Sequence, residues 1–336
     1  MALRFQVTRR RLSFLDPFNQ FAPKTLEVEI RRDPLSGDVA RILPFRLREL
    51  GPVDHSLWLE RAAGLPCPFC PEHVHQMTAR FLPADEPEGR LCRGDAVCFP
   101  NAFPYESMNT VLVLTREHYV RPSQFTPEVL ANGLELAREA FARLGRGARF
   151  ASVNWNYMMP AGAGLVHPHF QLAAGQGPTA FQARVRSRQQ AYARRTGGDL
   201  AAEYLAAEEA TGERWLGRRG PAGWLAAFAP RGIYDFMALA PGRTLPELTA
   251  DEVLGLAQGL TRVLGFLETE GVGAYNLALH TALAPGLGLP LMLRVVSRVD
   301  IPPLGVDEIN YFEKLHDEML SFLRPEEAAR RLGSVA

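Results

Sequence analysis

The same order of structural elements occurs twice in this sequence, about 123 residues apart. Each copy contains two strands, an amphipathic helix and two more strands. The first helix begins after Thr126, and the second begins at the capping box of Thr249 and Glu252. The strands with clear patterns are Ala96–Phe99, Val111–Leu114, Phe150–Trp155, His167–Ala173, Trp224–Phe228 and Phe236–Ala240. We therefore expect an α+β fold in which both copies join one antiparallel sheet that is backed by helices.

The repeat divides the chain into three segments. Residues 1–180 hold the first copy and an N-terminal hairpin, in which Leu26–Arg31 and Val39–Phe45 flank the turn Asp33–Gly37. Residues 181–222 carry several arginines followed by several glutamates, which is typical of a solvated helical connector. A substrate or subunit contact is the alternative for this segment. Residues 223–336 hold the second copy.

Composition and charge exclude several classes of protein. Apolar residues make up 47% and charged residues 22% of the 336 residues, which is typical of a globular chain. Lys+Arg and Asp+Glu are both 37, so no overall field favours nucleic acid or an anionic membrane. No apolar run is long enough to span a membrane, and no secretory signal follows the N-terminal arginines. We expect a cytoplasmic protein that binds neither nucleic acid nor membrane.

Cys67-Pro68-Phe69-Cys70 is a C-x-x-C motif, whose spacing lets two thiolates bind one zinc ion. A redox pair and two structural cysteines are the alternatives, but no apolar strand precedes the motif as a redox site would require. Zinc needs two further ligands. The candidates are His73 and His75 nearby, or His118 and His167 farther along the chain.

His167-Pro168-His169-Phe170-Gln171 is the most informative string in the chain. On a strand, alternate residues point to the same side, so His167, His169 and Gln171 would share one face. A loop with Gly162 and Gly164 precedes them, and glycine lets backbone N–H groups approach phosphate oxygens closely. The string therefore indicates an anion site.

Taken together, these motifs resemble the galactose-1-phosphate uridylyltransferase branch of the histidine-triad superfamily. The resemblance rests on the order and spacing of Cys67-x-x-Cys70, Asn101-Ala102-Phe103-Pro104, Glu117-His118, Asn156 and His167-Pro168-His169-x-Gln171. It extends to a C-terminal helix at Pro325–Leu332. It implies tandem histidine-triad-like repeats with a half-barrel sheet, and it implies a homodimer.

The resemblance also implies roles for individual residues. Cys67, Cys70, His118 and His167 would hold a structural zinc ion. His169 would be the nucleophile that attacks the α-phosphorus of a nucleoside diphosphate sugar, and Gln171 would donate a hydrogen bond to a phosphate oxygen. The residues implied in substrate binding are Asn101, Asn156, Gly162, Gly164, Arg46 and Arg48.

The implied reaction is transfer of a UMP group from UDP-glucose to a hexose 1-phosphate through a nucleotidyl-histidine. The alternative is an ADP-sugar or dinucleoside polyphosphate phosphorylase, which passes an AMP group to inorganic phosphate with the same histidine. A non-catalytic nucleotide-binding protein is a third possibility.

Three departures from the family pattern affect these expectations. Ala102 stands where the family often has an aspartate that contacts the nucleoside, and Gly164 stands where it tends to have a serine on the phosphate. The strand that should repeat His167–Gln171 carries Met292 and Arg294. Of the three second-copy histidines of the family's second metal site only His280 is present, so no iron is expected. Function is therefore expected in the first copy, with the second copy as scaffold.

Overall fold

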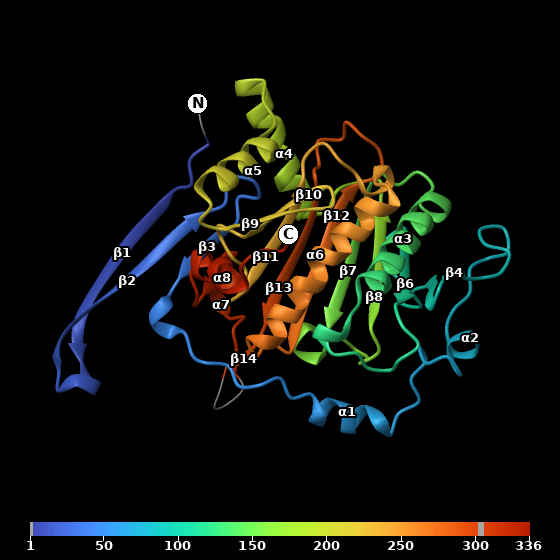
Figure 1. The fold of residues 1–336 in the computed structure, drawn as a ribbon, viewed down its shortest axis with the longest axis horizontal. Coiled ribbons are helices and arrows are strands. Elements are labelled where there is room, and N and C mark those ends of the chain that lie inside the picture. Colours follow the sequence, from blue (N-terminus) through green and yellow to red (C-terminus); the bar gives the residue numbers. More distant parts are fainter. Residues whose placement is uncertain (1–2, 302–305) are drawn as a thin grey trace.

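One large sheet of ten strands dominates the computed structural model, which describes residues 3–301 and 306–336 (Figure 1). The order across this sheet is β4 (Leu91–Arg93), β5 (Ala96–Pro100), β6 (Met108–Val113), β8 (His169–Gly175), β7 (Phe150–Tyr157), β12 (Ala274–Ala282), β13 (Leu291–Arg298), β11 (Asp235–Ala240), β10 (Ala222–Ala226) and β9 (Trp215–Arg219). All its neighbouring strands are antiparallel. The sheet is open, because β4 and β9 form its two edges.

The two copies meet at the centre of this sheet. From either edge inward, the strand order is the same in both halves, and the halves join where β7 pairs with β12. In that pairing Asn156 lies opposite Asn276, and Asn154 lies opposite Ala278. The expected α+β class and the continuous antiparallel sheet are therefore confirmed.

Two long helices cover one face of the sheet. Helices α3 (Pro127–Leu144) and α6 (Ala250–Thr269) lie side by side along it (Figure 1), and the side chains of Thr126 and Thr249 cap them as the sequence predicts. Their packing is close, because a Cβ atom on Gly259 of α6 would lie 2.4 Å from the buried ring of Trp224. Only glycine fits at that point of contact.

Two other helices cover half of the opposite face. Helices α4 (Ala180–Thr196) and α5 (Leu200–Thr211) form the expected charged connector, yet they are not merely solvated. Val185, Tyr192, Leu200, Ala201, Tyr204 and Leu205 are buried in a cluster that includes Leu225, Met237 and Met292 of the second copy. The connector therefore covers the second copy and leaves part of the first copy's face uncovered.

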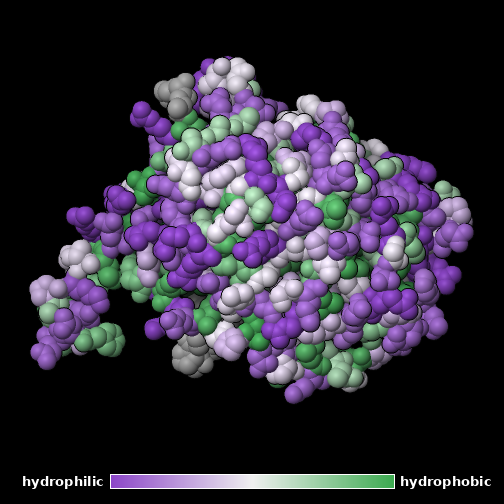
Figure 2. Space-filling model, viewed as in Figure 1, coloured by the Kyte–Doolittle hydropathy of each residue, from purple (hydrophilic) through white to green (hydrophobic). Residues whose placement is uncertain are grey.

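The N-terminal hairpin is part of a smaller sheet with the order β1-β2-β3-β16. Its members are β1 (Val7–Asp16), β2 (Ala22–Arg32), β3 (Val39–Ile42) and β16 (Glu318–Ser321), of which β16 is parallel to β3. The sequence pattern gives no sign of β1, because its residues are exposed on both faces until Asp16. The β1–β2 arm stands away from the body and carries hydrophobic as well as hydrophilic side chains (Figure 2).

The remaining elements are short. They are η1 (Pro17–Asn19), η2 (Pro44–Arg46), α1 (Ser56–Ala63), α2 (Val74–Met77), η3 (Pro122–Gln124), η4 (Met159–Ala161), η5 (Leu245–Glu247), β14 (Asp300–Ile301), β15 (Val306–Asp307), α7 (Tyr311–His316) and α8 (Pro325–Leu332). Helix α8 has the bounds that the family resemblance predicts. In the described part of the chain, no helix is long and apolar enough to cross a membrane.

One strand expectation needs correction where it touches the site. Strand β8 begins at His169, so His167 and Pro168 lie in the preceding loop and not in the strand. The loop still runs beside β6, because the Pro168 carbonyl accepts a hydrogen bond from the N–H of Leu114 at 3.0 Å. The Pro168 ring has no N–H to continue a strand ladder, which fits this boundary.

A buried ionic network fills the place in the second copy that corresponds to Gln171. Arg294 faces Ala278 as Gln171 faces Asn154. Its guanidinium donates to Asp235 at 2.6 Å and to Asp38 at 2.9 Å. Burial alone would raise the pKa of Asp38. The neighbouring Arg231 and Arg294 outweigh burial and hold this pKa well below its ordinary value. This network connects Asp38, the residue before β3, to β11 and β13.

We predict that Arg294→Ala lowers the free energy of unfolding by about 3–5 kcal/mol, because it leaves the buried carboxylate of Asp235 without its guanidinium partner. Denaturant unfolding measures this change. The matched control is Arg218→Ala, which breaks an exposed pair with Glu209 and should cost less than about 1 kcal/mol. Equal costs for the two variants would show that the Arg294 network is not a determinant of stability.

Candidate active site

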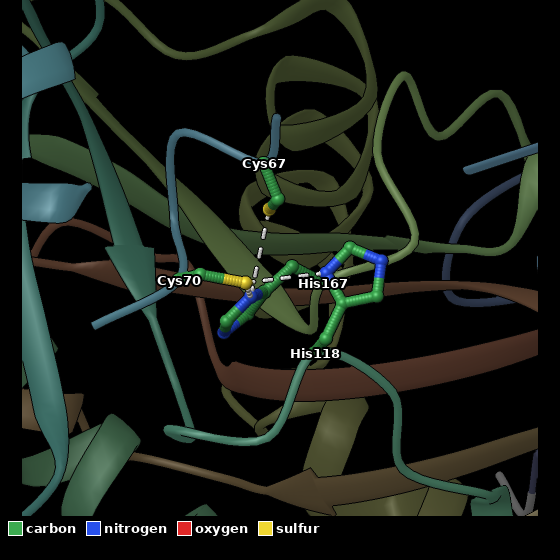
Figure 3. Close-up of side chains that lie close together, drawn as sticks. All are labelled: Cys67, Cys70, His118 and His167. Atoms are coloured by element: carbon green, nitrogen blue, oxygen red, sulfur yellow. Dashed lines mark hydrogen bonds between the residues drawn. The ribbon is translucent and has the colours of Figure 1, made fainter. Parts of the chain in front are cut away.

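Two cysteines and two histidines from three separate segments come together beside β8. Cys67 and Cys70 lie between α1 and α2, His118 follows β6, and His167 precedes β8. One ligand atom from each lies within 4.8 Å of all the others. Figure 3 shows the four side chains pointing toward a common centre.

The distances in this cluster suit a tetrahedral zinc ion. Cys70 Sγ lies 3.4 Å from His118 Nδ1, and both sulfurs lie 3.7 Å from His167 Nδ1. Zinc–sulfur and zinc–nitrogen bonds at tetrahedral angles place such atoms roughly 3.5 Å apart. His167 also donates from Nε2 to the Thr115 carbonyl at 2.8 Å, which leaves the Nδ1 lone pair for a metal. The four residues thus form a Cys₂His₂ group that is compatible with a structural zinc site.

The nearer histidines are not members of the cluster. His73 uses its Nδ1 in a 3.0 Å hydrogen bond with the Cys67 carbonyl, so it supports the C-x-x-C loop.

Burial and the neighbouring Cys67 raise the pKa of Cys70 to about 12, so without a cation the thiolate is disfavoured. A divalent cation would reverse that preference, because thiolates bind metals and thiols do not.

His169 is the first residue of β8 and is 8% exposed. Its Nδ1–H donates to the carbonyl of His167 at 2.8 Å, which leaves Nε2 with its lone pair. Burial lowers the pKa of His169, although the His167 carbonyl opposes this shift. The imidazole is therefore neutral at neutral pH, as a nucleophile must be. Phe69, from the C-x-x-C motif, packs edge-on against this ring at 5.1 Å between centroids.

Gln171 is two residues after His169 in β8, so the two side chains lie on the same face of the strand. Its Oε1 accepts a 2.8 Å hydrogen bond from the hydroxyl of Tyr105. Its amide N–H₂ group is thereby left to donate elsewhere. Asn154 on β7 holds the backbone at this point through a 3.1 Å bond to the Gln171 carbonyl.

The loop between β7 and β8 is strained and partly open. Met158 is buried, yet its φ is +64°, a conformation that side chains other than glycine rarely adopt. Gly162, at φ +87°, donates its N–H to the Met159 carbonyl at 2.8 Å, so this amide is used within the loop. The N–H groups of Gly164, Leu165 and Val166 have no partner among the residues that the structure describes. These three amides, unlike that of Gly162, are therefore not used within the loop.

The other predicted substrate residues lie in different surroundings. Asn156 sits on β7 beside the loop, with its Oδ1 bonded to Asn276. Asn101 fixes its own loop, through bonds to Asn109 and to the N–H of Phe103. Arg46 stacks over the ring of Phe322. Arg48 lines a cavity of about 380 Å³ with Tyr234, Glu270 and Arg331. The phosphate-binding role of both arginines stays a prediction.

Sequence reasoning missed three residues that contact the site. Phe69 was visible only as the spacer of a cysteine motif, and Tyr105 belongs to no motif of the sequence. Asn276 lies in the second copy, where the lack of a catalytic motif drew no attention to it. No periodicity could reveal these contacts, since each joins segments that are distant in the sequence.

His280 is the one histidine that the resemblance assigns to a second metal site. It packs against Phe181, and its Nδ1 has no hydrogen-bond partner. Burial and the charges of Arg231 and Arg294 lower its pKa to about 4. In residues 3–301 and 306–336, only the Cys67 group gathers three or more metal-ligand side chains. The absence of iron stays a prediction.

We predict that Cys67→Ser lowers zinc to well below one equivalent per chain and the free energy of unfolding by about 4 kcal/mol or more. The physical reason is that binding energy at such a site is folding energy. Metal analysis and thermal unfolding test this, with Cys92→Ser as control, because Cys92 is exposed and outside the cluster. Purified protein without zinc, or a Cys67→Ser variant as stable as the control, would contradict the assignment.

Comparisons with known proteins place this chain. No family model matches it. An uncharacterized protein of Archaeoglobus fulgidus is 30% identical over 310 residues, which cover 92% of each chain. The fold is similar to that of an ADP-glucose phosphorylase from Arabidopsis thaliana with bound ADP-glucose, at a TM-score of 0.70 and 16% identity, over 92% of this chain and 99% of that one. A uridylyltransferase has a TM-score of 0.63 and 20% identity, over 91% and 98%. The chain therefore belongs to one family with the Archaeoglobus fulgidus protein, and it shares its fold with the ADP-glucose phosphorylase and the uridylyltransferase.

Proposed function

We propose that this protein is a nucleotidyltransferase that forms a covalent nucleotidyl-histidine on His169. The observation that carries the proposal is the hydrogen bond from His169 Nδ1 to the His167 carbonyl at 2.8 Å. It fixes the neutral tautomer with Nε2 as the reactive atom, and it does so on a buried ring whose lowered pKa keeps it unprotonated.

The first half-reaction joins Nε2 to the α-phosphorus of a nucleoside diphosphate sugar. The N–P bond forms while the bond from phosphorus to the bridging oxygen breaks, and the sugar 1-phosphate leaves with that oxygen. The ring gains positive charge as the N–P bond forms. The His167 carbonyl, which accepts the Nδ1–H, stabilises that charge in a water-poor setting.

The non-bridging oxygens carry the negative charge during transfer. The amide of Gln171, whose oxygen is already held by Tyr105, and the open N–H groups of Gly164 to Val166 are the donors proposed for them. In the second half-reaction a phosphate oxygen of the acceptor attacks phosphorus, the N–P bond breaks, and His169 returns to its neutral form. Kinetics of the ping-pong type follow.

Two donor and acceptor pairs are candidates. The first is UDP-glucose with a hexose 1-phosphate, as the motif resemblance implies. The second is an ADP-sugar with inorganic phosphate, which the similarity to an ADP-glucose phosphorylase favours. A dinucleoside polyphosphate remains a further donor for the second route.

The metal would supply no chemistry to the substrate in this scheme. Zinc held by Cys67, Cys70, His118 and His167 would have four protein ligands and no open position. Zinc would influence the site only through the protein, because its ligand His167 also provides the carbonyl that accepts the hydrogen bond from His169. Thiolate ligands suit a reducing compartment, so we propose the cytoplasm as the location.

We also propose a homodimer in which the β1–β2 arm contacts a second copy of this chain. An isolated two-stranded hairpin is marginally stable in water, yet this arm has ten paired positions and stands away from the body (Figure 1). It exposes Leu12, Leu15, Phe18 and Phe21, of which Phe18 is 97% exposed.

Sedimentation should give about twice the chain mass of 37.2 kDa, and Leu12→Glu with Phe18→Glu should weaken the association. A wild-type protein that sediments as a monomer at all concentrations would contradict the dimer.

We predict that His169→Ala lowers nucleotidyl transfer by more than about 10³-fold, because it removes the attacking atom. The assay follows sugar 1-phosphate release from UDP-glucose and from ADP-glucose, each with hexose 1-phosphate and with inorganic phosphate. Zinc content and the unfolding transition should stay unchanged, whereas His167→Ala should lower both. Full turnover by His169→Ala would reject the nucleophile, and nucleotide binding without any turnover would favour the non-catalytic class.

A further inference from the structure

We infer that Asn276, which belongs to the second copy, is a positioning residue for the anion site of the first copy. The inference rests on the proposed function and extends it. Asn276 would act by fixing Asn156 and the β7–β8 loop in the orientation that binds the phosphates of a nucleoside diphosphate. The second copy would then contribute to the site and would not be scaffold alone.

Asn276 lies directly across the joint between the two copies. It pairs with Asn156 in the β7–β12 register. The β7–β8 register places Asn154 opposite Gln171, so Asn156, two residues farther, is level with His169. The three residues His169, Asn156 and Asn276 thus form one row across three neighbouring strands, on the face that α3 and α6 leave open.

The side chain of Asn276 donates two hydrogen bonds to residues beside the site. Its Nδ2 donates to Asn156 Oδ1 at 2.8 Å and to the Ala161 carbonyl at 2.8 Å. The first bond occupies the Asn156 oxygen, so the Asn156 N–H₂ group is turned away from the joint. That group has only a long contact of 3.5 Å with the Gly162 carbonyl. It is therefore available to a phosphate oxygen.

The orientation of Asn276 is itself fixed. Its Oδ1 accepts from Arg298 at 3.2 Å, which leaves the N–H₂ group as the only donor on the Asn156 side. Arg298 is held in turn by Glu308 at 3.2 Å and by Asp307 at 3.1 Å. The chain Arg298, Asn276, Asn156 therefore sets which end of the Asn156 amide faces an anion.

The bond to Ala161 controls the strained loop. Ala161 is in η4, between Met158 at φ +64° and Gly162 at φ +87°. Holding this turn helps to keep the open N–H groups of Gly164 to Val166 next to β8. One side chain from the second copy thus contacts both Asn156 and the loop.

The test is equilibrium binding of ADP and of UDP to the zinc-loaded protein. Asn276→Ala should weaken binding of the preferred nucleotide by about 10- to 100-fold, the effect of one lost hydrogen bond to a charged group. Asn276→Asp keeps the side-chain shape and removes the donor, so it should weaken binding at least as much. His280→Gln is the control, because His280 lies on the same strand and face without a hydrogen bond, and it should change the affinity by less than about twofold.

A double substitution separates positioning from general damage. In an Asn156→Ala background, Asn276→Ala should cost less than about threefold more, because the group it orients is gone. Zinc content and the unfolding transition should stay at wild-type values in all variants. Unchanged affinity in Asn276→Ala, or an equal loss in both backgrounds, would overturn the inference while the proposed function stands. A wild-type protein that binds neither nucleotide would overturn both.

Discussion

The antiparallel pairing of β7 with β12 is the interaction on which the rest of the structure depends. It joins the two copies into one sheet, and its register places Asn156 opposite Asn276. A shift of one residue would turn every side chain on β12 to the other face. The polar row beside His169 would then be lost, and apolar side chains such as Leu277 and Leu279 would leave the core under α6.

The two copies have the same strand arrangement but carry different side chains at corresponding positions. On the face away from α3 and α6, the first copy keeps His169 and Gln171 beside an open loop. At the corresponding places the second copy has Met292, which packs under α4 and α5, and Arg294, which neutralises buried carboxylates. In the second copy this place is therefore filled by protein side chains.

The sequence predicted much of this arrangement. Helix caps, turn residues and apolar periodicity are local signals, so the helices after Thr126 and Thr249 and the core strands were predictable. The Cys67, Cys70, His118 and His167 group was predictable only through the family resemblance, since four ligands spread over a hundred residues leave no local pattern. Strand β1 was missed because an arm exposed on both faces has no alternation. Asn276 and Tyr105 were missed because their contacts exist only once the sheet has formed.

Mass spectrometry can detect the proposed covalent nucleotidyl group on His169. The protein is incubated with ADP-glucose or UDP-glucose in the absence of acceptor and then digested. We expect a gain of one nucleoside monophosphate on the peptide that contains His169, lost again in acid or when the acceptor is added. Turnover without any such adduct, or an adduct on another residue, would contradict it.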